Sequence, residues 1–291
     1  MEDLLTVAAV ARQIGVAPAT LRTWARRYGV GPSSHAAGEH RKYCSSDLAK
    51  LMLMRRLITA GVSPASAAEQ ALTYKGEFKV EKIFKKFEVR SEIVDAVVTA
   101  AKALDRNFIE VILRKDINRF GVIVSWREVI VPVLVIIGDE WAATGKGIEV
   151  EHLLSETITG LMRERPLSVK KPLNTRPVLL ASVGEELHCL ALHALHAALA
   201  EENIECNFMG ARTPLEALSN MVTRSAPPAI FLWAQLSKNG DSKYFRDIPK
   251  IRPAPRVILG GPGWDRQSCT GIPFADDLAF ACAEIKAAIG A

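Results

Sequence analysis

Glu186 and His188 stand two positions apart in the segment SVGEELHCLA, between an apolar stretch and a predicted helix. A carboxylate at this spacing can accept a hydrogen bond from one imidazole nitrogen and leave the other nitrogen free to bind a metal ion. His193 and His196, on the predicted helix, could form a second metal-binding pair, but a place at the helix edge is the simpler interpretation. The pattern makes His188 the candidate metal ligand and Glu186 its partner.

A second group of chemically useful residues lies where two helical stretches meet. Gly145 and Gly147 end one stretch, and the next begins at once. Trp141, one turn before the bend, would therefore come near Glu151 and His152, one turn after it. Structural roles fit equally, because tryptophan packs in cores and glutamate favours a helix N-terminus. The residues alone leave both interpretations open.

Positive charge is concentrated near the N-terminus. The first 56 residues hold nine Lys or Arg and four Asp or Glu, whereas the rest of the chain holds 28 of each kind. The whole net charge of +5 therefore lies in this segment. A basic segment on an otherwise balanced chain favours a polyanionic partner such as nucleic acid, with a solvated basic surface as the alternative.

The elements that would present this charge have the pattern of a helix-turn-helix. Thr6 can cap a helix over residues 7–14, Gly15 permits a turn, and Pro18 lies in the first turn of a second helix. That second helix carries three arginines, and its N-terminal end is the one that enters a major groove. A hairpin and two further helices are predicted to follow.

Three segments, LRTWARRYG, GEHRKY and DLAKLMLMRRLITAGVSPASAA, resemble the winged-helix DNA-binding domain of the MerR family of transcription regulators. The resemblance implies a domain over residues 1–75 that contacts phosphates and base edges through its second helix and its wing. Trp24 is expected in the core. The implied DNA-binding residues are Thr20, Arg22, Arg26, Arg27, Tyr28, His40, Arg41 and Tyr43.

Helical periodicity continues beyond a lysine-rich connection. Apolar residues recur at three- and four-residue spacing, as at Ile109, Ile112 and Leu113, and short loops separate the periodic segments. Pro132 should kink the third helix or interrupt its hydrogen bonds. We expect a linker and a four-helix bundle over residues 76–170, with helices at about 91–104, 107–119, 125–144 and 148–165.

The last third of the chain alternates between buried strands and helices. Strands are predicted over PVLLAS, IECNFMG, AIFLWAQ and RVILGG, with helices between them and a final helix over DDLAFACAEIKAAIG. This order is typical of a doubly wound parallel α/β sheet, which binds ligands at the carboxyl ends of its strands. We expect such a Rossmann-like domain over residues 171–291, without the glycine fingerprint of a dinucleotide site.

The strand ends of this domain resemble those of the cobalamin-binding domain. Glu186-Leu187-His188-Cys189-Leu190-Ala191 corresponds to that family's Asp-x-His-x-x-Gly motif, whose histidine is the lower axial ligand of cobalt. Its Ser-x-Leu motif corresponds to Ala234-Gln235-Leu236, without the serine that would bond the nucleotide tail. Its Gly-Gly motif is present as Gly260-Gly261. The resemblance implies His188 as the cobalt ligand, and Glu186, Leu236 and the glycine pair as cofactor-binding residues.

Taken in order, the three parts resemble the CarH/LitR family of photoreceptor repressors. In that family a tryptophan, nine residues and a Glu-His pair cover the upper face of adenosylcobalamin, and here residues 142–150 separate Trp141 from Glu151-His152. The resemblance implies a multidomain α and α/β repressor that binds an operator in double-stranded DNA as a dimer or tetramer. Ala142 departs from the histidine that light-sensing members carry after the tryptophan.

An alternative keeps the regulator and changes its signal. The cobalamin-like domain could have lost cobalamin binding or the response to light, and could sense another tetrapyrrole, a small molecule or a partner protein. An enzyme is not expected, because a corrinoid enzyme module would need a catalytic barrel that this chain has no segment to form. We expect a cytoplasmic protein without a membrane span, since no continuous apolar run is long enough and the five cysteines form no close pairs.

Overall fold

The computed structural model of this protein describes residues 5–33, 41–59, 62–73 and 90–291. The chain divides into two compact units, one made of residues 1–112 and 128–154 and the other of residues 113–127 and 155–291. Each unit is described here by itself. The three domains expected from the sequence stay a prediction.

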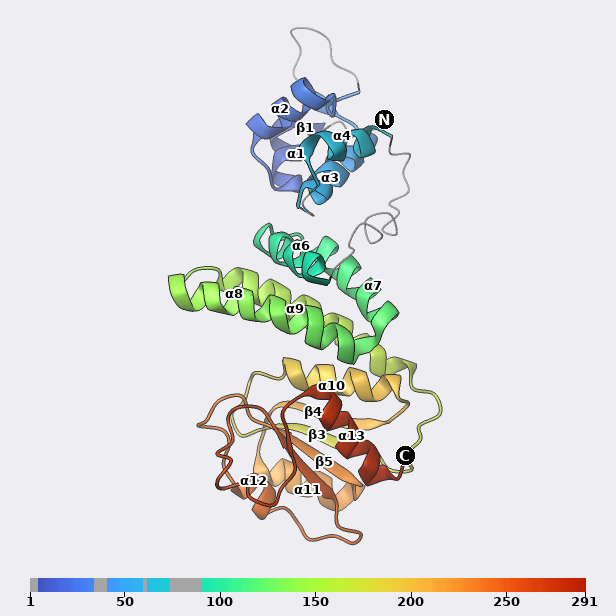
Figure 1. The fold of residues 1–291 in the computed structure, drawn as a ribbon, viewed down its shortest axis with the longest axis vertical. Helices are drawn as coiled ribbons and strands as arrows, with labels where there is room; N and C mark the ends of the chain where they lie inside the picture. Colours follow the sequence, from blue (N-terminus) through green and yellow to red (C-terminus); the bar gives the residue numbers. More distant parts are fainter. Residues whose placement is uncertain (1–4, 34–40, 60–61, 74–89) are drawn as a thin grey trace. The chain divides into compact units, whose positions relative to one another are not determined.

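The first unit begins with a small helical domain (Figure 1). Thr6 accepts a hydrogen bond from the backbone N–H of Ala9 and caps the first helix as predicted. Gly29, with φ of 72°, ends the second helix in the left-handed conformation. Trp24 is buried in the core, which confirms that prediction. The helices are α1 (Val7–Ile14), α2 (Pro18–Tyr28), α3 (Ser45–Thr59) and α4 (Pro64–Leu72), and the antiparallel strands β1 (Leu5–Thr6) and β2 (Lys42–Tyr43) pair beside them.

The middle of the chain is helical, as predicted, and its break at Gly121 lies in the interval expected between the second and third helices, residues 119–125. Gly121, with φ of 79° and ψ of 167°, interrupts the second of these helices. A π-helical segment directly precedes Pro132, so the α-helical hydrogen-bond pattern is interrupted there, as predicted. Ile130 keeps helical φ and ψ, so helical geometry continues from Trp126 into the following helix. The elements are α6 (Arg90–Lys102), α7 (Arg106–Ser125), η1 (Trp126–Ile130), α8 (Val131–Thr144) and α9 (Ile148–Glu164).

By length and composition alone, the helical stretch Arg106–Thr144 is apolar enough to cross a membrane. One such helix is weak evidence, because core helices of other proteins pass the same test. The stretch also contains the kink at Gly121 and the charged residues Arg127 and Glu128.

The second unit contains a five-stranded parallel sheet in the order β4-β3-β5-β6-β7. The four predicted strands are present as β3 (Val178–Val183), β4 (Cys206–Thr213), β5 (Ala229–Trp233) and β6 (Arg256–Gly260). The two-residue strand β7 (Phe274–Ala275) was not predicted. Every residue of β3 is buried, as expected for a strand covered on both faces.

Helices cover both faces of this sheet (Figure 1). α10 (Leu190–Glu201) and α13 (Leu278–Ile289) lie on one face, and α11 (Leu215–Ser225) and the short α12 (Lys243–Arg246) lie on the other. The second face packs a core that includes Leu179, Leu232, Leu218 and Trp264. Doubly wound sheets with this strand order bind ligands at the carboxyl ends of their strands. The loops after β3, β5 and β6 leave the sheet at these carboxyl ends.

Candidate functional site

The loop after β3 holds Glu186 and His188 as the predicted pair. His188 Nδ1 lies 2.6 Å from Glu186 Oε1, and the backbone N–H of His188 donates to the same oxygen at 2.9 Å. The Glu186 side chain is fully buried, whereas that of His188 is 59% exposed. Since an ionised carboxylate can only accept, Nδ1 carries a proton, and in the neutral imidazole Nε2 keeps its lone pair.

The second oxygen of Glu186 bonds the loop after β5. It accepts hydrogen bonds from the backbone N–H groups of Gln235 and Leu236, each at 2.9 Å, and from the side-chain amide of Asn239 at 3.0 Å. Burial alone would raise the pKa of Glu186, but the hydrogen bonds from Asn239, Leu236 and His188 lower it to about 2. Glu186 is therefore a buried anion that ties two neighbouring loops together.

The exposed surface beside His188 is apolar. Leu187 is 64% exposed and Leu236 is 39% exposed, although leucines usually pack inward. Both belong to the loops that Glu186 joins. An imidazole on loops that also expose two leucines suits a flat apolar group that carries a metal at its centre.

The glycine pair after β6 packs against the protein itself. A Cβ on Gly260 would lie 2.4 Å from the Phe231 ring, and a Cβ on Gly261 would lie 2.2 Å from the carbonyl oxygen of Ala234. Gly261 also has φ of 95°, which side chains rarely adopt. Both glycines are required by local packing, so their presence does not by itself indicate a ligand.

His193 and His196 pack against one ring instead of forming a metal site. Their imidazoles stack on Phe208 at centroid distances of 4.4 and 5.2 Å. Burial lowers the pKa of each to about 4, so both are neutral at physiological pH. His193 is buried, not at the helix edge as expected. Among the described residues, no group of three or more His, Cys, Asp or Glu side chains could hold a metal ion.

The residues predicted at the α8–α9 bend lie on the surface of the first unit. Trp141, one turn before the C-cap Gly145, is 47% exposed, so it is not the core residue that the structural interpretation required. Glu151 and His152 lie in the first turns of α9, and Glu151 Oε2 is 2.7 Å from His152 Nδ1. The chain thus has a second carboxylate-held imidazole.

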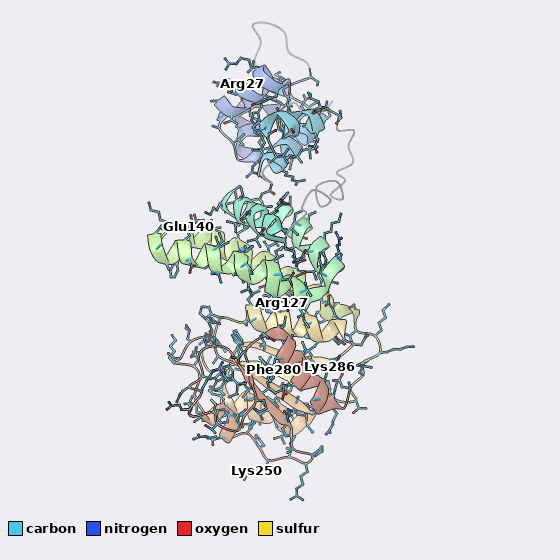
Figure 2. All side chains as sticks on the ribbon, viewed as in Figure 1. Arg27, Arg127, Glu140, Lys250, Phe280 and Lys286 are labelled. Carbon is cyan, nitrogen blue, oxygen red and sulfur yellow. The ribbon has the colours of Figure 1, made fainter. Side chains whose placement is uncertain are left out.

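A groove of about 580 Å³ runs along α2 in the N-terminal domain. Three arginines, Arg22, Arg26 and Arg41, line it together with Gly29 and Gly31. Trp24 anchors the opposite side of α2 in the core, so that the arginine side faces outward. Figure 2 shows Arg27 projecting from the same helix. Guanidinium groups along an open groove can bind a polyanion.

The remaining predicted DNA contacts differ in their surroundings. Thr20 and Tyr28 are partly exposed on α2, and His40 lies outside the described residues. Tyr43 is fully buried in the domain core. Since alternate residues of a strand face opposite sides, Lys42 of β2 points outward and Tyr43 inward. The assignment of Tyr43 as a DNA contact is therefore corrected to a core role.

The sequence of residues 5–71 matches the MerR HTH family of regulatory proteins. This part of the chain is a MerR-type DNA-binding domain. The domain contains the helix-turn-helix, the antiparallel strand pair and the arginine-lined groove. The match covers the DNA-binding part of the chain.

The rest of the chain is also similar to known proteins. The HTH-type transcriptional repressor CarH of Myxococcus xanthus is 26% identical over 260 residues, which cover 86% of this chain and 84% of the relative. The monomethylamine corrinoid protein of Methanosarcina barkeri covers 69% of this chain and 99% of its own with a TM-score of 0.55 and 13% identity. A cobalamin-binding protein from Desulfitobacterium hafniense matches 67% of the chain with a TM-score of 0.34 and 17% identity. The TM-score of 0.55 with the monomethylamine corrinoid protein shows a shared fold.

Two buried polar residues of the site were missed by the sequence prediction. Asn239 bonds Glu186 from 53 positions away, a separation that only the sheet topology bridges. In the MerR-type domain, the Asp47 carboxylate accepts the backbone N–H of Ser33 and of Cys44, each at 3.1 Å. Burial opposes the charge of Asp47, but these hydrogen bonds lower its pKa. The signal available for Asp47 was an acidic residue in the first turn of a predicted helix.

Proposed function

We propose that this MerR-type regulator is a repressor whose binding to a double-stranded DNA operator is controlled by adenosylcobalamin. The observation that carries the proposal is the Glu186–His188 pair, with Nδ1 held at 2.6 Å and the imidazole exposed at the carboxyl edge of a parallel sheet. We place the protein in the cytoplasm, as a dimer or tetramer, and propose no enzymatic reaction for it.

The residues present fit an axially bound cobalt. His188 would be the lower axial ligand, because its Nε2 is free and its other nitrogen is held by a carboxylate, the usual arrangement of a metal-binding histidine. Leu187 and Leu236 would lie against the edge of the corrin, and Gly260 and Gly261 would stay close to its nucleotide tail. When bound, adenosylcobalamin would supply a cobalt–carbon bond that light can break.

On the opposite face of the corrin we propose Trp141, Glu151 and His152. The exposed indole of Trp141 would pack on the upper axial group, and Glu151 would accept its hydrogen bonds. His152, whose Nδ1 is held by Glu151, would support this arrangement. Ala142 has no atom that can coordinate cobalt, so a response to light would not end in a bond to this residue.

For DNA we propose that Arg22, Arg26, Arg27 and Arg41 bind phosphates and base edges, with Thr20, Tyr28 and His40 beside them. Loss of the upper ligand would loosen the oligomer and release the operator. A ligand shifts such a balance only by its different affinity for the two states, and about a hundredfold difference corresponds to ~2.7 kcal/mol.

The deciding experiment is an absorption spectrum of the purified chain with adenosylcobalamin, before and after green light. We expect co-elution of the cofactor and a His-on spectrum, which His188→Ala abolishes. His196→Ala is the matched control, because that imidazole stacks on Phe208 away from the loop. A spectrum identical to that of free cobalamin, without co-elution, would end the cobalamin proposal.

A second candidate is a metal tetrapyrrole without a nucleotide tail. The packing of Phe231 and Ala234 against the glycine pair, and the alanine in place of the tail-binding serine, favour it. Titration with hemin distinguishes the two. A His188-dependent shift of the absorption maximum with hemin, and none with cobalamin, would select this candidate.

A further inference from the structure

The Glu186 carboxylate has two oxygens with separate tasks. Oε1 holds the backbone N–H and Nδ1 of His188, and Oε2 receives the loop after β5. If Oε2 lost its donors, the carboxylate could rotate about its last side-chain bond and withdraw Oε1 from Nδ1. The direction of the imidazole therefore depends on what holds the far oxygen.

Among the described residues, Asn239 is the one whose side chain donates a hydrogen bond to Glu186 Oε2. Its Nδ2 lies 3.0 Å from Oε2, and the residue is only 6% exposed. Its backbone N–H donates to the carbonyl of Leu236 at 2.9 Å, which closes the loop into a turn. A buried amide that donates to a buried anion makes a charge-assisted bond, the stronger class of hydrogen bond.

We propose that Asn239 is a positioning residue for His188. By holding Oε2, it keeps Oε1 aimed at Nδ1 and keeps the imidazole in the tautomer whose Nε2 is bare and directed outward. Two backbone donors, from Gln235 and Leu236, also reach Oε2, and Asn239 adds the side-chain donor from the same turn. The consequence for cofactor binding rests on the proposed function, whereas the tautomer of His188 does not.

The test is the tautomer of His188 in the full chain without cofactor, read from nitrogen-15 chemical shifts. The chain has six histidines, so selective labelling can resolve His188. We expect a proton on Nδ1 in the unaltered protein. Asn239→Asp removes the donor and places a second carboxylate beside Glu186, and should shift the tautomer ratio about tenfold toward the Nε2–H form.

Two further variants keep the test decisive if Asn239→Asp does not fold. Asn239→Ser retains a hydroxyl donor and should keep more of the Nδ1–H form than Asn239→Ala. Asn220→Asp, on the exposed surface of α11, is the matched control and should change nothing. An unchanged tautomer ratio in folded Asn239→Asp, or equal ratios in the Ser and Ala variants, would overturn the proposal.

A second measurement separates this proposal from the function it refines. If cobalamin binds, Asn239→Ala should weaken it by about 10- to 100-fold, the usual cost of losing a group behind a metal ligand. If cobalamin binds neither protein, the proposed function fails while the tautomer measurement still decides the role of Asn239.

Discussion

A fully buried glutamate is expensive unless its charge is satisfied. Glu186 meets that condition with five hydrogen bonds, from His188, Gln235, Leu236 and Asn239. Protonation of the Glu186 carboxylate would place a hydrogen on one oxygen, and that oxygen could then accept fewer hydrogen bonds. The network therefore selects the ionised form, and the ionised form in turn directs the imidazole. The stability of the fold and the orientation of the His188 imidazole therefore both depend on the ionisation of Glu186.

This coupling predicts a specific pH dependence. The pKa of Glu186 is about 2 in the folded chain, below its ordinary value of 4.5. Its contribution is therefore fully present above pH 4.5 and is lost as the pH falls from 4.5 toward 2, and it amounts to about 3 kcal/mol. Glu186→Gln should lower the free energy of unfolding at neutral pH, and the gap to the unaltered protein should shrink on acidification.

The measurement is urea denaturation at several pH values between neutral and acid. Glu185→Gln is the control, because the neighbouring Glu185 is exposed and pairs with Arg212 at the surface. That substitution should cost less than about 1 kcal/mol at any pH. A gap between Glu186→Gln and the unaltered chain that stays constant with pH would contradict the assignment of the lowered pKa.

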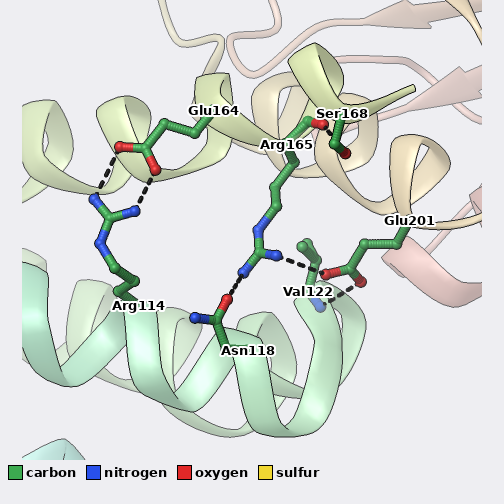
Figure 3. Close-up of polar contacts among 7 residues, drawn as sticks. All are labelled: Arg114, Asn118, Val122, Glu164, Arg165, Ser168 and Glu201. Atoms are coloured by element: carbon green, nitrogen blue, oxygen red, sulfur yellow. Dashed lines mark hydrogen bonds and ion pairs between the residues drawn. The ribbon is translucent and has the colours of Figure 1, made fainter. Parts of the chain in front are cut away.

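At the scale of elements, the kink in α7 shows how a side chain from another helix can replace a helical hydrogen-bond acceptor. Gly121 leaves helical geometry, and the backbone N–H of Val122 donates instead to Glu201 of α10 at 2.8 Å. Figure 3 shows Arg165 between Glu201 and Asn118, and Arg114 paired with Glu164. Side chains of α9 and α10 thus fix the C-terminal part of α7 within the second unit.

Glu201→Ala should therefore destabilise the chain more than a surface charge change does. Val122 is fully buried, and loss of the acceptor leaves its N–H without a partner, which costs about 1–3 kcal/mol. Glu202→Ala is the adjacent control, because Glu202 makes a partly exposed ion pair with Lys286 worth at most about 1 kcal/mol. Equal midpoints of urea denaturation for the two variants would refute the capping role of Glu201.

The elements were predictable where a local pattern determines them. Four apolar strands, the cap at Thr6, the turn at Gly15 and the Glu186–His188 pair could all be predicted from the sequence. The two-residue strand β7 has no periodicity to detect, and Asn239 reaches Glu186 only because β3 and β5 are neighbours. Pro132 predicted the interruption of the helix, but not that it takes the form of a π-helical segment over Trp126–Ile130.

At the scale of the whole molecule, the chain separates its net charge from the residues proposed to bind a ligand. The net charge of +5 lies in the first 56 residues, in which Arg22, Arg26 and Arg41 line the groove along α2. The remaining residues are balanced in charge. A polyanion should therefore be bound by the N-terminal domain, and residues of the corrinoid-protein fold should influence DNA only through the ligand.

This separation predicts where the salt dependence of DNA binding originates. Each phosphate contact releases counterions, so the logarithm of affinity falls with the logarithm of salt in proportion to the number of contacts. Arg26→Ala should weaken binding to all DNA sequences and reduce that slope by about 1 if Arg26 contacts a phosphate.

Arg22→Ala and Arg41→Ala should weaken DNA binding as well, with relaxed sequence specificity if either arginine reads a base. Lys250→Ala, at an exposed lysine in the loop before β6, removes the same charge from the second unit and should leave the slope unchanged (Figure 2). Gel shifts over a range of salt concentrations measure both quantities. Slopes that fall equally for Arg26→Ala and Lys250→Ala would mean that net charge, and not the groove along α2, attracts the DNA.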